Sequence, residues 1–202
     1  MSDYDRWAPG YDRRWRRYTD ITLGRLLDYL DLRQYRDALD VGCGTGALLL
    51  RLHERCPALR LVGIDLSTGM LAVAREKLAG YGVDLRQGNA YSLPLPAHGV
   101  DLVTMASILH YVARPSLACA EARRVLRPGG ALAVVDYVPR GGLSSGADGL
   151  IRLYDHEHVR AHDLPALRAI FTHAGFHVTH AERFPIDRFC YGVLALGALT
   201  VK

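Results

Sequence analysis

Residues 38–46 read Ala-Leu-Asp-Val-Gly-Cys-Gly-Thr-Gly, a short apolar run followed by glycine at every second position. The apolar run is typical of a buried strand, and the pattern that follows predicts a helix over residues 46–55. Glycines let the chain turn sharply and let a ligand lie against the main chain. The start of the helix offers free N–H groups and the positive end of a dipole, which favour a carboxylate or a phosphate. We interpret this stretch as a strand–turn–helix unit that binds a ligand, with a tight turn that binds nothing as the alternative.

The regions around this stretch alternate between apolar strands and amphipathic helices. We expect strands over residues 38–41, 61–64, 83–87, 100–105 and 131–136, and helices over 19–30, 46–55, 67–79 and 116–126. A Gly/Ser-rich loop over 139–149, a helix over 163–173 that ends at Gly175, and strands over 176–184 and 191–200 follow. These elements predict an α/β fold: a Rossmann-like, doubly wound, mostly parallel seven-stranded sheet that ends in an antiparallel β-hairpin.

A carboxylate ends the second expected strand, about 20 residues after the glycine-rich turn, where an acidic ribose anchor is expected. Asp65 in the segment Gly-Ile-Asp-Leu-Ser can accept hydrogen bonds from both ribose hydroxyls. Its alternative role is to cap the helix that follows, but Ser67 can do this. Asp65 is therefore available to a nucleoside ligand.

Two features distinguish the two nucleoside ligands that this arrangement could hold, NAD and S-adenosylmethionine (SAM). The turn has the spacing Gly42-x-Gly44-x-Gly46 rather than the G-x-G-x-x-G of dinucleotide sites. Asp40 precedes the turn, where its charge would repel a pyrophosphate and attract the ammonium and sulfonium of SAM. Both features favour SAM.

Five ordered motifs resemble those of the class I SAM-dependent methyltransferases. They are DVGCGTG (40–46), GIDLS (63–67), QGNAYSLPLP (87–96), DLVTMASILHYV (101–112) and RVLRPGGALAVVD (124–136). Within this family they are most similar to the ubiquinone/menaquinone-biosynthesis type, known as type 11. The resemblance implies one domain over residues 1–202, with an N-terminal helical lid (1–34), a SAM-binding core (35–137), and a substrate-side loop, helix and hairpin (138–202).

The resemblance also implies a set of cofactor-binding residues. Gly42, Gly44 and Gly46 would pass under the methionine part of SAM, Asp40 would orient that part, and Asp65 would hold the ribose. Leu66, Asn89 and Ala90 would surround the adenine, Ser107 would line the methyl-transfer side, and Tyr11 would cover SAM from the lid. The family usually has Asp where Asn89 stands, but the Asn carbonyl oxygen can still accept a hydrogen bond from the adenine amine.

The acceptor side is less defined. A hydroxyl acceptor needs a base, and the candidates are His110, His156, His158 and His162. We choose His158 ahead of His110 because its segment could close over the acceptor; a surface-loop role for each His is the alternative. We expect no metal, because no matching set of Cys or carboxylates is evident. We expect the pocket to form between the lid, with Trp7, Trp15 and Tyr18, and the 139–155 segment. A quinone precursor, a lipid head group and a secondary metabolite all remain candidate acceptors.

Composition limits the functional classes. The chain has 202 residues, half of them apolar, and a net charge of +4. It has no apolar run of the roughly 20 residues that cross a bilayer and no apparent secretory signal. The four cysteines lack zinc spacing. We therefore expect a cytoplasmic protein, as a monomer or homodimer, that binds a small-molecule acceptor and no nucleic acid.

One cluster of basic residues stands apart in the sequence: Arg13, Arg14, Arg16 and Arg17 surround Trp15. A solvated helix face is the first interpretation, and peripheral contact with anionic ligands or a membrane surface is the alternative. Three other functions also stay open as alternatives: an NAD-dependent oxidoreductase, a non-catalytic SAM-binding regulator, and a methyltransferase that acts on a macromolecule. The last is disfavoured because Ser-Ile-Leu-His stands at 107–110, where an Asn/Asp-Pro-Pro-Tyr type motif would be expected.

Overall fold

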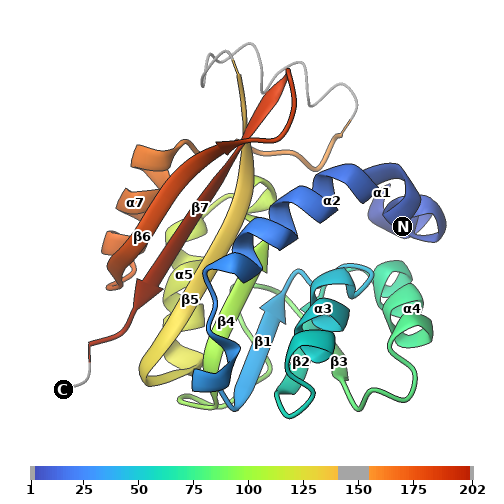
Figure 1. Cartoon of the computed structure of the whole chain (residues 1–202), viewed down its shortest axis with the longest axis horizontal. Helices are drawn as coiled ribbons and strands as arrows, with labels where there is room; N and C mark the ends of the chain where they lie inside the picture. Colours follow the sequence, from blue (N-terminus) through green and yellow to red (C-terminus); the bar gives the residue numbers. More distant parts are fainter. Residues whose placement is uncertain (1–2, 141–154, 201–202) are drawn as a thin grey trace.

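The computed structural model of the chain describes residues 3–140 and 155–200. A single seven-stranded sheet has helices on both faces (Figure 1). Its strands are β1 (Asp37–Val41), β2 (Arg60–Asp65), β3 (Asp84–Gln87), β4 (Val100–Ala106), β5 (Leu126–Pro139), β6 (His177–Pro185) and β7 (Cys190–Ala198). They lie in the order β3-β2-β1-β4-β5-β7-β6, and β7 runs antiparallel to both of its neighbours. The predicted fold class is therefore confirmed, including the terminal hairpin.

The helices divide into two layers. They are α1 (Asp3–Trp7), α2 (Tyr11–Asp28), α3 (Ala47–Arg55), α4 (Thr68–Lys77), α5 (Pro115–Val125) and α7 (Leu164–His173), with short 3₁₀ turns at Ala8–Gly10, Leu32–Gln34 and Leu109–Tyr111. Leucines of α2, α3 and α4 share one buried cluster, whereas apolar residues of α5 and α7 share the other. Successive residues of β5 point to opposite faces of the sheet: Val134 belongs to the cluster with α5 and α7, and Val135 to the cluster with α2, α3 and α4. The period-two pattern of the strands thus builds a core on each face of the sheet.

Three element boundaries differ from the sequence prediction by three residues or more. Helix α2 begins at Tyr11 rather than at residue 19, because its first two turns place aromatic rather than aliphatic side chains inward. Strand β5 begins at Leu126 and carries the Pro128–Gly130 turn inside it, where the register against β4 shifts. It also continues to Pro139, into the predicted loop; the rest of that loop lies outside the described residues.

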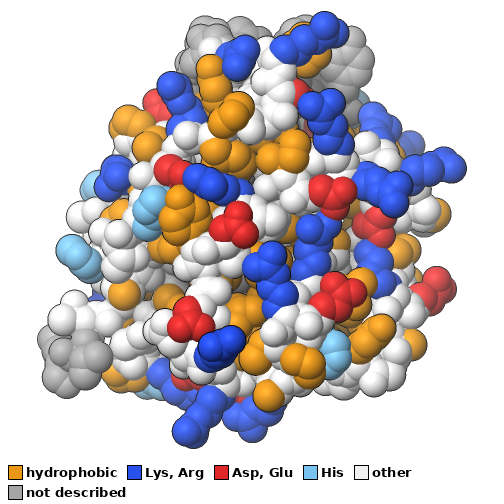
Figure 2. All heavy atoms as spheres, in the orientation of Figure 1, with side chains coloured by type: hydrophobic (Ala, Val, Ile, Leu, Met, Phe, Trp, Pro, Cys, Tyr) orange, Lys and Arg blue, Asp and Glu red, His pale blue; other side chains and the backbone are white. Residues whose placement is uncertain are grey.

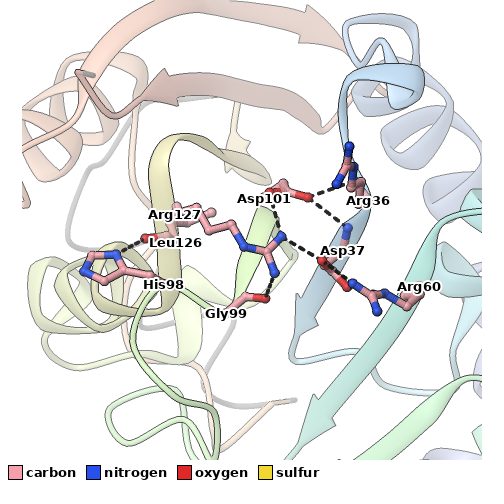
Figure 3. Close-up of polar contacts among 8 residues, drawn as sticks. All are labelled: Arg36, Asp37, Arg60, His98, Gly99, Asp101, Leu126 and Arg127. Carbon is pink, nitrogen blue, oxygen red and sulfur yellow. Dashed lines mark hydrogen bonds and ion pairs between the residues drawn. The ribbon is translucent and has the colours of Figure 1, made fainter. Parts of the chain in front are cut away.

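An ion-pair network joins the amino ends of the strands (Figure 3). Arg127 Nη1 donates to Asp37 Oδ2 (2.7 Å) and Asp101 Oδ1 (2.8 Å), and Arg127 Nη2 donates to the carbonyl of Gly99 (2.7 Å). Arg60 pairs with the other oxygen of Asp37 at 2.6 Å, and Asp101 also accepts the N–H of Asp37. Partial burial acts to raise the pKa of Asp37 and of Asp101, but hydrogen bonds from the arginines outweigh it and lower both pKa values. Every charge in this cluster has a partner, which suits a structural role.

Within residues 3–140 and 155–200, no helix is both long and apolar enough to cross a bilayer.

Candidate functional site

A cavity of about 440 Å³ opens at the carboxyl ends of β1, β2 and β4, at the other end of these strands from the ion-pair network. Its floor is the glycine-rich turn between β1 and α3, and its roof comes from α1 and the first turns of α2. The carboxyl edge of a parallel sheet is where ligands bind in folds of this type. The cavity therefore lies where the sequence motifs predicted a site.

The three glycines of the turn have left-handed backbones, with φ of +70° at Gly42, +53° at Gly44 and +79° at Gly46. A Cβ on Gly42 would meet Ile108 Cδ1 at 2.6 Å, and one on Gly46 would meet Leu78 Cδ1 at 2.7 Å, but nothing lies within 4 Å of one on Gly44. Gly42 and Gly44 line the cavity, whereas Gly46 caps α3 and lets it pack against α4. Only Gly44 keeps open space free, as a close ligand approach requires.

Asp65 lines the cavity with its carboxylate already oriented. One oxygen accepts the N–H of Gly44 at 2.7 Å and the other accepts the N–H of Ser67 at 2.8 Å. Burial raises the pKa of Asp65, and these backbone hydrogen bonds offset part of the rise. Each carboxylate oxygen can accept a second hydrogen bond, so both remain available to a pair of hydroxyls. Ser67 takes the capping role for α4, because its Oγ accepts the N–H of Met70.

Asp40 lies at the floor of the cavity and is 2% exposed. Its Oδ1 accepts a hydrogen bond of 2.7 Å from Thr104 Oγ1. Burial raises the pKa of Asp40 to about 7; the bond from Thr104 offsets part of the rise, and the charge of Asp65 adds to it. A cationic ligand beside Asp40 would favour its charged form. This end of the cavity is thus suited to a positive group.

The residues expected around the adenine all line the cavity: Leu66, Asn89 and Ala90. Leu66 is 67% exposed and lines the cavity, so its side chain is accessible to a ligand there. Asn89 Oδ1 accepts the N–H of Tyr91 at 2.9 Å. The side chain of Asn89 is therefore held in a local turn, and its carbonyl oxygen retains one lone pair for a ligand.

Ser107 lies in the cavity lining at the end of β4, with a left-handed backbone (φ +57°) that is costly for a residue other than glycine. Its Oγ is 2.7 Å from the hydroxyl of Tyr18, which also lines the cavity. Tyr11 lines it as well, so the predicted lid residue faces the ligand space. Trp7 and Trp15, which we expected in the acceptor pocket, are not among the lining residues.

Two tyrosines of the lining were missed by the sequence reasoning. Tyr4 and Tyr111 join through their hydroxyls, and Tyr111 Oη donates to Asp155 Oδ2 at 2.7 Å. Burial is the main cause that raises the pKa of both tyrosines, so each hydroxyl stays protonated. Tyr111 stands inside the fourth motif beside His110, a signal that could have drawn attention to it.

The roof is tied to the helices below it by two carboxylates. Asp5 accepts hydrogen bonds from Ser67 Oγ (2.6 Å) and from the N–H of Gly69 (2.9 Å) at the start of α4. Asp12 accepts from Thr45 Oγ1 at 2.5 Å and pairs with Lys77. Polar contacts therefore help to hold α1 and the first turns of α2 over the cavity, whereas the second half of α2 packs into the core through its leucines.

The two histidines proposed as bases do not line the cavity, and each is 2% exposed. His110 Nδ1 lies 2.6 Å from Asp136 Oδ1, and His158 Nδ1 lies 3.2 Å from the hydroxyl of Tyr137. The two rings are 5.6 Å apart. Both imidazoles thus lie behind the cavity wall, where the ring of His110 packs against Tyr111.

The other candidate histidines do not form a metal site. His156 is exposed, and burial lowers the pKa of His162. Among the residues that the structure describes, no three His, Cys, Asp or Glu side chains are grouped so as to hold a metal ion.

Comparisons with known proteins agree with this geometry. A family model described as a methyltransferase domain matches residues 39–134. The demethylmenaquinone methyltransferase of Thermus thermophilus is 36% identical, over 93% of this chain and 89% of the relative. The ubiquinone/menaquinone biosynthesis C-methyltransferase UbiE of Dinoroseobacter shibae is 35% identical over 61% of this chain, which spans only 52% of that relative.

Solved structures share the fold. A chain from the Haloferax volcanii complex of the Trm112 methyltransferase activator with a methyltransferase superposes with a TM-score of 0.84, at 20% identity and over 99% of both chains. The [4+2]-cyclase SpnF has the same architecture, with a TM-score of 0.75 at 24% identity, over 93% of this chain and 84% of its own. The fold alone therefore does not fix the chemistry, and family membership rests on the motifs and on the full-length relative. The chain belongs to the class I SAM-dependent methyltransferases, in the type 11 group, and is similar there to ubiquinone- and menaquinone-biosynthesis enzymes.

Proposed function

We propose that the cavity binds SAM and that the protein transfers the methyl group to a small, partly apolar acceptor. The observation that carries this proposal is the position of Asp40, a buried carboxyl group at the cavity floor beside the open space over Gly44. A cation there makes the charged form of Asp40 favourable, and SAM carries two cationic groups. The pyrophosphate of NAD would instead face a carboxylate.

The remaining lining residues take the roles that the motifs implied. Gly42 and Gly44 pass under the methionine part, and Asp65 accepts hydrogen bonds from the ribose hydroxyls. Leu66 and Ala90 cover the adenine, and Asn89 accepts from its amine. Gly46 acts indirectly, because its missing side chain lets α3 approach α4 and so shapes the turn. Tyr11 covers the ligand from the roof, and Ser107 lies on the methyl-transfer side.

The acceptor that we propose is a quinone precursor, which the names of both relatives support. The wall around Ser107 has the composition that such a ring needs, with the tyrosines Tyr4, Tyr18 and Tyr111 beside the aliphatic Ile108. Small-ligand sites combine such apolar walls with a few polar groups that fix orientation.

Methyl transfer forms a bond from the acceptor to the methyl carbon and breaks the carbon–sulfur bond, so the sulfonium becomes a neutral thioether. The acceptor loses a proton, and the chain mainly aligns the reacting atoms. Because His110 and His158 lie behind the wall, we assign them as positioning residues that act through Tyr111 and Tyr137. His158→Ala should then lower kcat by less than the hundredfold or so that general-base catalysis contributes at its lower limit.

Two measurements test the function. Calorimetric titration should show binding of SAM and none of NAD. A panel of quinone precursors, lipid head groups and phenolic metabolites, assayed for S-adenosylhomocysteine release, should give turnover with a quinone precursor. Binding of NAD in place of SAM would contradict the cofactor assignment. SAM binding without turnover on any acceptor would instead identify a SAM-binding regulator.

A further inference from the structure

An exposed basic surface stands beside the cavity and has no part in the proposed methyl transfer. Four of its arginines lie on α2, at positions 13, 14, 16 and 17, and three lie where β5, β6 and β7 meet their connecting turns, at positions 140, 183 and 188. Helix α2 lies against this part of the sheet, because the ring centroids of Tyr18 and Tyr137 are 6.3 Å apart and Arg25 pairs with Glu182 of β6 at 2.6 Å. Figure 2 shows basic side chains along the upper and right-hand parts of the face drawn in Figure 1, with hydrophobic side chains between them.

The described part of the chain gives these arginines no ion pair. Within residues 3–140 and 155–200, none of the seven lies within ion-pair distance of a carboxylate. The nearby carboxylates are engaged elsewhere: Asp12 with Lys77 and Asp20 with Arg51. Asp187 accepts the N–H groups of its own turn. At the opposite edge of the sheet, by contrast, Arg127 meets two carboxylates (Figure 3).

Several of these guanidinium groups lie over aromatic rings instead. Arg14 lies over the rings of Trp7 and Trp15, at 5.8 and 5.7 Å from their centroids. Arg188 lies 4.6 Å from the centroid of Phe189, and both Arg140 and Arg183 lie within 4.8 Å of that of Tyr191. A stacked guanidinium keeps its N–H edge free, and that edge fits phosphate oxygens two at a time.

Two of the aromatic side chains on this surface are themselves exposed, Phe189 at 67% and Trp15 at 39%. Phe189 stands in the turn of the terminal hairpin, so its ring projects at an edge of the molecule. Aromatic rings among arginines are typical of proteins that rest at the head-group level of a bilayer.

We propose that this arginine–aromatic surface, formed by Arg13–Arg17, Arg140, Arg183 and Arg188–Tyr191, docks the protein on an anionic phospholipid bilayer. The guanidinium groups would donate to lipid phosphates, and Phe189 and Trp15 would enter the head-group layer. Tyr11 and Tyr18 of the same helix line the cavity, so docking would bring the cavity close to the lipid. The idea that an apolar acceptor enters the cavity from the lipid rests on the proposed function, whereas the docking itself does not.

The test uses sedimentation of the full chain with vesicles of phosphatidylcholine, alone or with about 30% phosphatidylglycerol, since anionic lipid attracts basic residues at roughly 1 kcal/mol each. We expect binding only to the anionic vesicles. Arg13→Gln/Arg17→Gln removes two charges one helix turn apart and should weaken binding at least about tenfold. Phe189→Ala should weaken binding to the same vesicles through loss of its ring.

Matched control variants remove an equal charge, or an exposed hydrophobic side chain, from sites outside the proposed surface. Arg33→Gln/Arg75→Gln removes the same charge from exposed sites elsewhere, and Leu117→Ala removes an exposed side chain from α5; both should bind vesicles as the unmodified chain does. SAM titration in solution should give the same affinity for every variant, so a wrong cofactor assignment would show there and not in the vesicle assay. Equal binding to both vesicle types, or full binding by Arg13→Gln/Arg17→Gln, would overturn the proposal. Binding to single-stranded RNA that is lost in that variant, without vesicle binding, would assign the surface to nucleic acid instead.

Discussion

Aspartates at the amino ends of the strands (the amino edge) and at their carboxyl ends (the carboxyl edge) differ in whether an arginine neutralises them. At the amino edge, Arg127 gives Asp37 and Asp101 a cation, and the pKa values of both carboxyls fall. At the carboxyl edge, Asp40 is buried and Asp65 is half-buried, with no Lys or Arg within ion-pair distance in the described part of the chain, and their pKa values rise. Burying an unpaired carboxylate is costly. Two such carboxylates around one cavity fit the proposed ligand, which would supply a cation beside Asp40 and hydroxyls to Asp65.

The largest effect should come from filling the space above the turn. Gly44→Val places a branched side chain where nothing lies within 4 Å, and should abolish SAM binding in a calorimetric titration. Gly80→Val is the matched control, because Gly80 also has positive φ (+86°) and open space, but lies outside the cavity lining. Both variants should lose similar stability, about 1–2 kcal/mol for a left-handed residue. Normal SAM binding by Gly44→Val would show that the turn does not contact the ligand.

A substitution at the amino edge should lower the stability of the protein and leave its affinity for SAM unchanged. Arg127→Ala removes donors to two carboxylates and a carbonyl. It should lower the free energy of unfolding by about 2 kcal/mol, the scale of charged hydrogen bonds, as measured by urea denaturation. The dissociation constant for SAM should not change. A loss of SAM affinity in the folded variant would show that the two edges are coupled and do not act independently.

The pH dependence should distinguish the edges further. Because the pKa of Asp40 is about 7 in the fold against 3.8 ordinarily, the native state holds an extra proton between these values, and stability falls as pH rises through this window. A bound cation favours the charged carboxylate, so SAM affinity should rise about tenfold from pH 6 to pH 8. The amine of SAM titrates near pH 8, so the control is Asp40→Asn, in which the rise should be absent. A rise of the same size in that variant would assign it to another group.

The smallest effect concerns the roof. Asp5→Ala removes the acceptor for Ser67 Oγ and the N–H of Gly69, and should cost about 1 kcal/mol, as loss of a helix cap does. Amide hydrogen exchange over residues 3–20 should be faster in this variant, and in the unmodified chain it should slow when SAM or its demethylated product binds. Exchange that is identical with and without ligand would remove the idea that these helices open and close.

Local signals predicted the fold, and nine of the ten residues that they assigned to the cofactor line one cavity, with Gly46 as the exception. The glycine-rich turn and Asp65 are each defined by a strand end and the residues directly after it, so their positions follow from the alternation of elements. The start of β5 was misplaced because Pro128–Gly130 is typical of a turn, and only pairing with β4 keeps it in the strand. The sequence could not distinguish the roles of Gly46 and Gly44. A Cβ on Gly46 would clash with Leu78 and one on Gly44 would meet nothing, and this difference depends on where α4 packs.

The acceptor side depends on contacts between distant segments, which no local pattern contains. Tyr4 and Tyr111 meet across 107 positions. His158 was placed over the acceptor because its segment is irregular, but the segment folds back so that the N–H groups of Val159 and Arg160 bond to the carbonyl of His110. That contact turns the imidazole of His158 toward Tyr137, behind the cavity wall.

One measurement compares the edges most directly: titration of SAM into the unmodified chain, Asp65→Ala and Asp101→Ala. Both substitutions remove one partly or fully buried aspartate that accepts backbone N–H groups, one at each edge of the sheet. We predict that Asp65→Ala weakens SAM binding by about 1–3 kcal/mol, the cost of lost charged hydrogen bonds, and that Asp101→Ala binds SAM as the unmodified chain does. Equal SAM affinity in folded Asp65→Ala and the unmodified chain would contradict the assignment of the carboxyl-edge cavity as the SAM site.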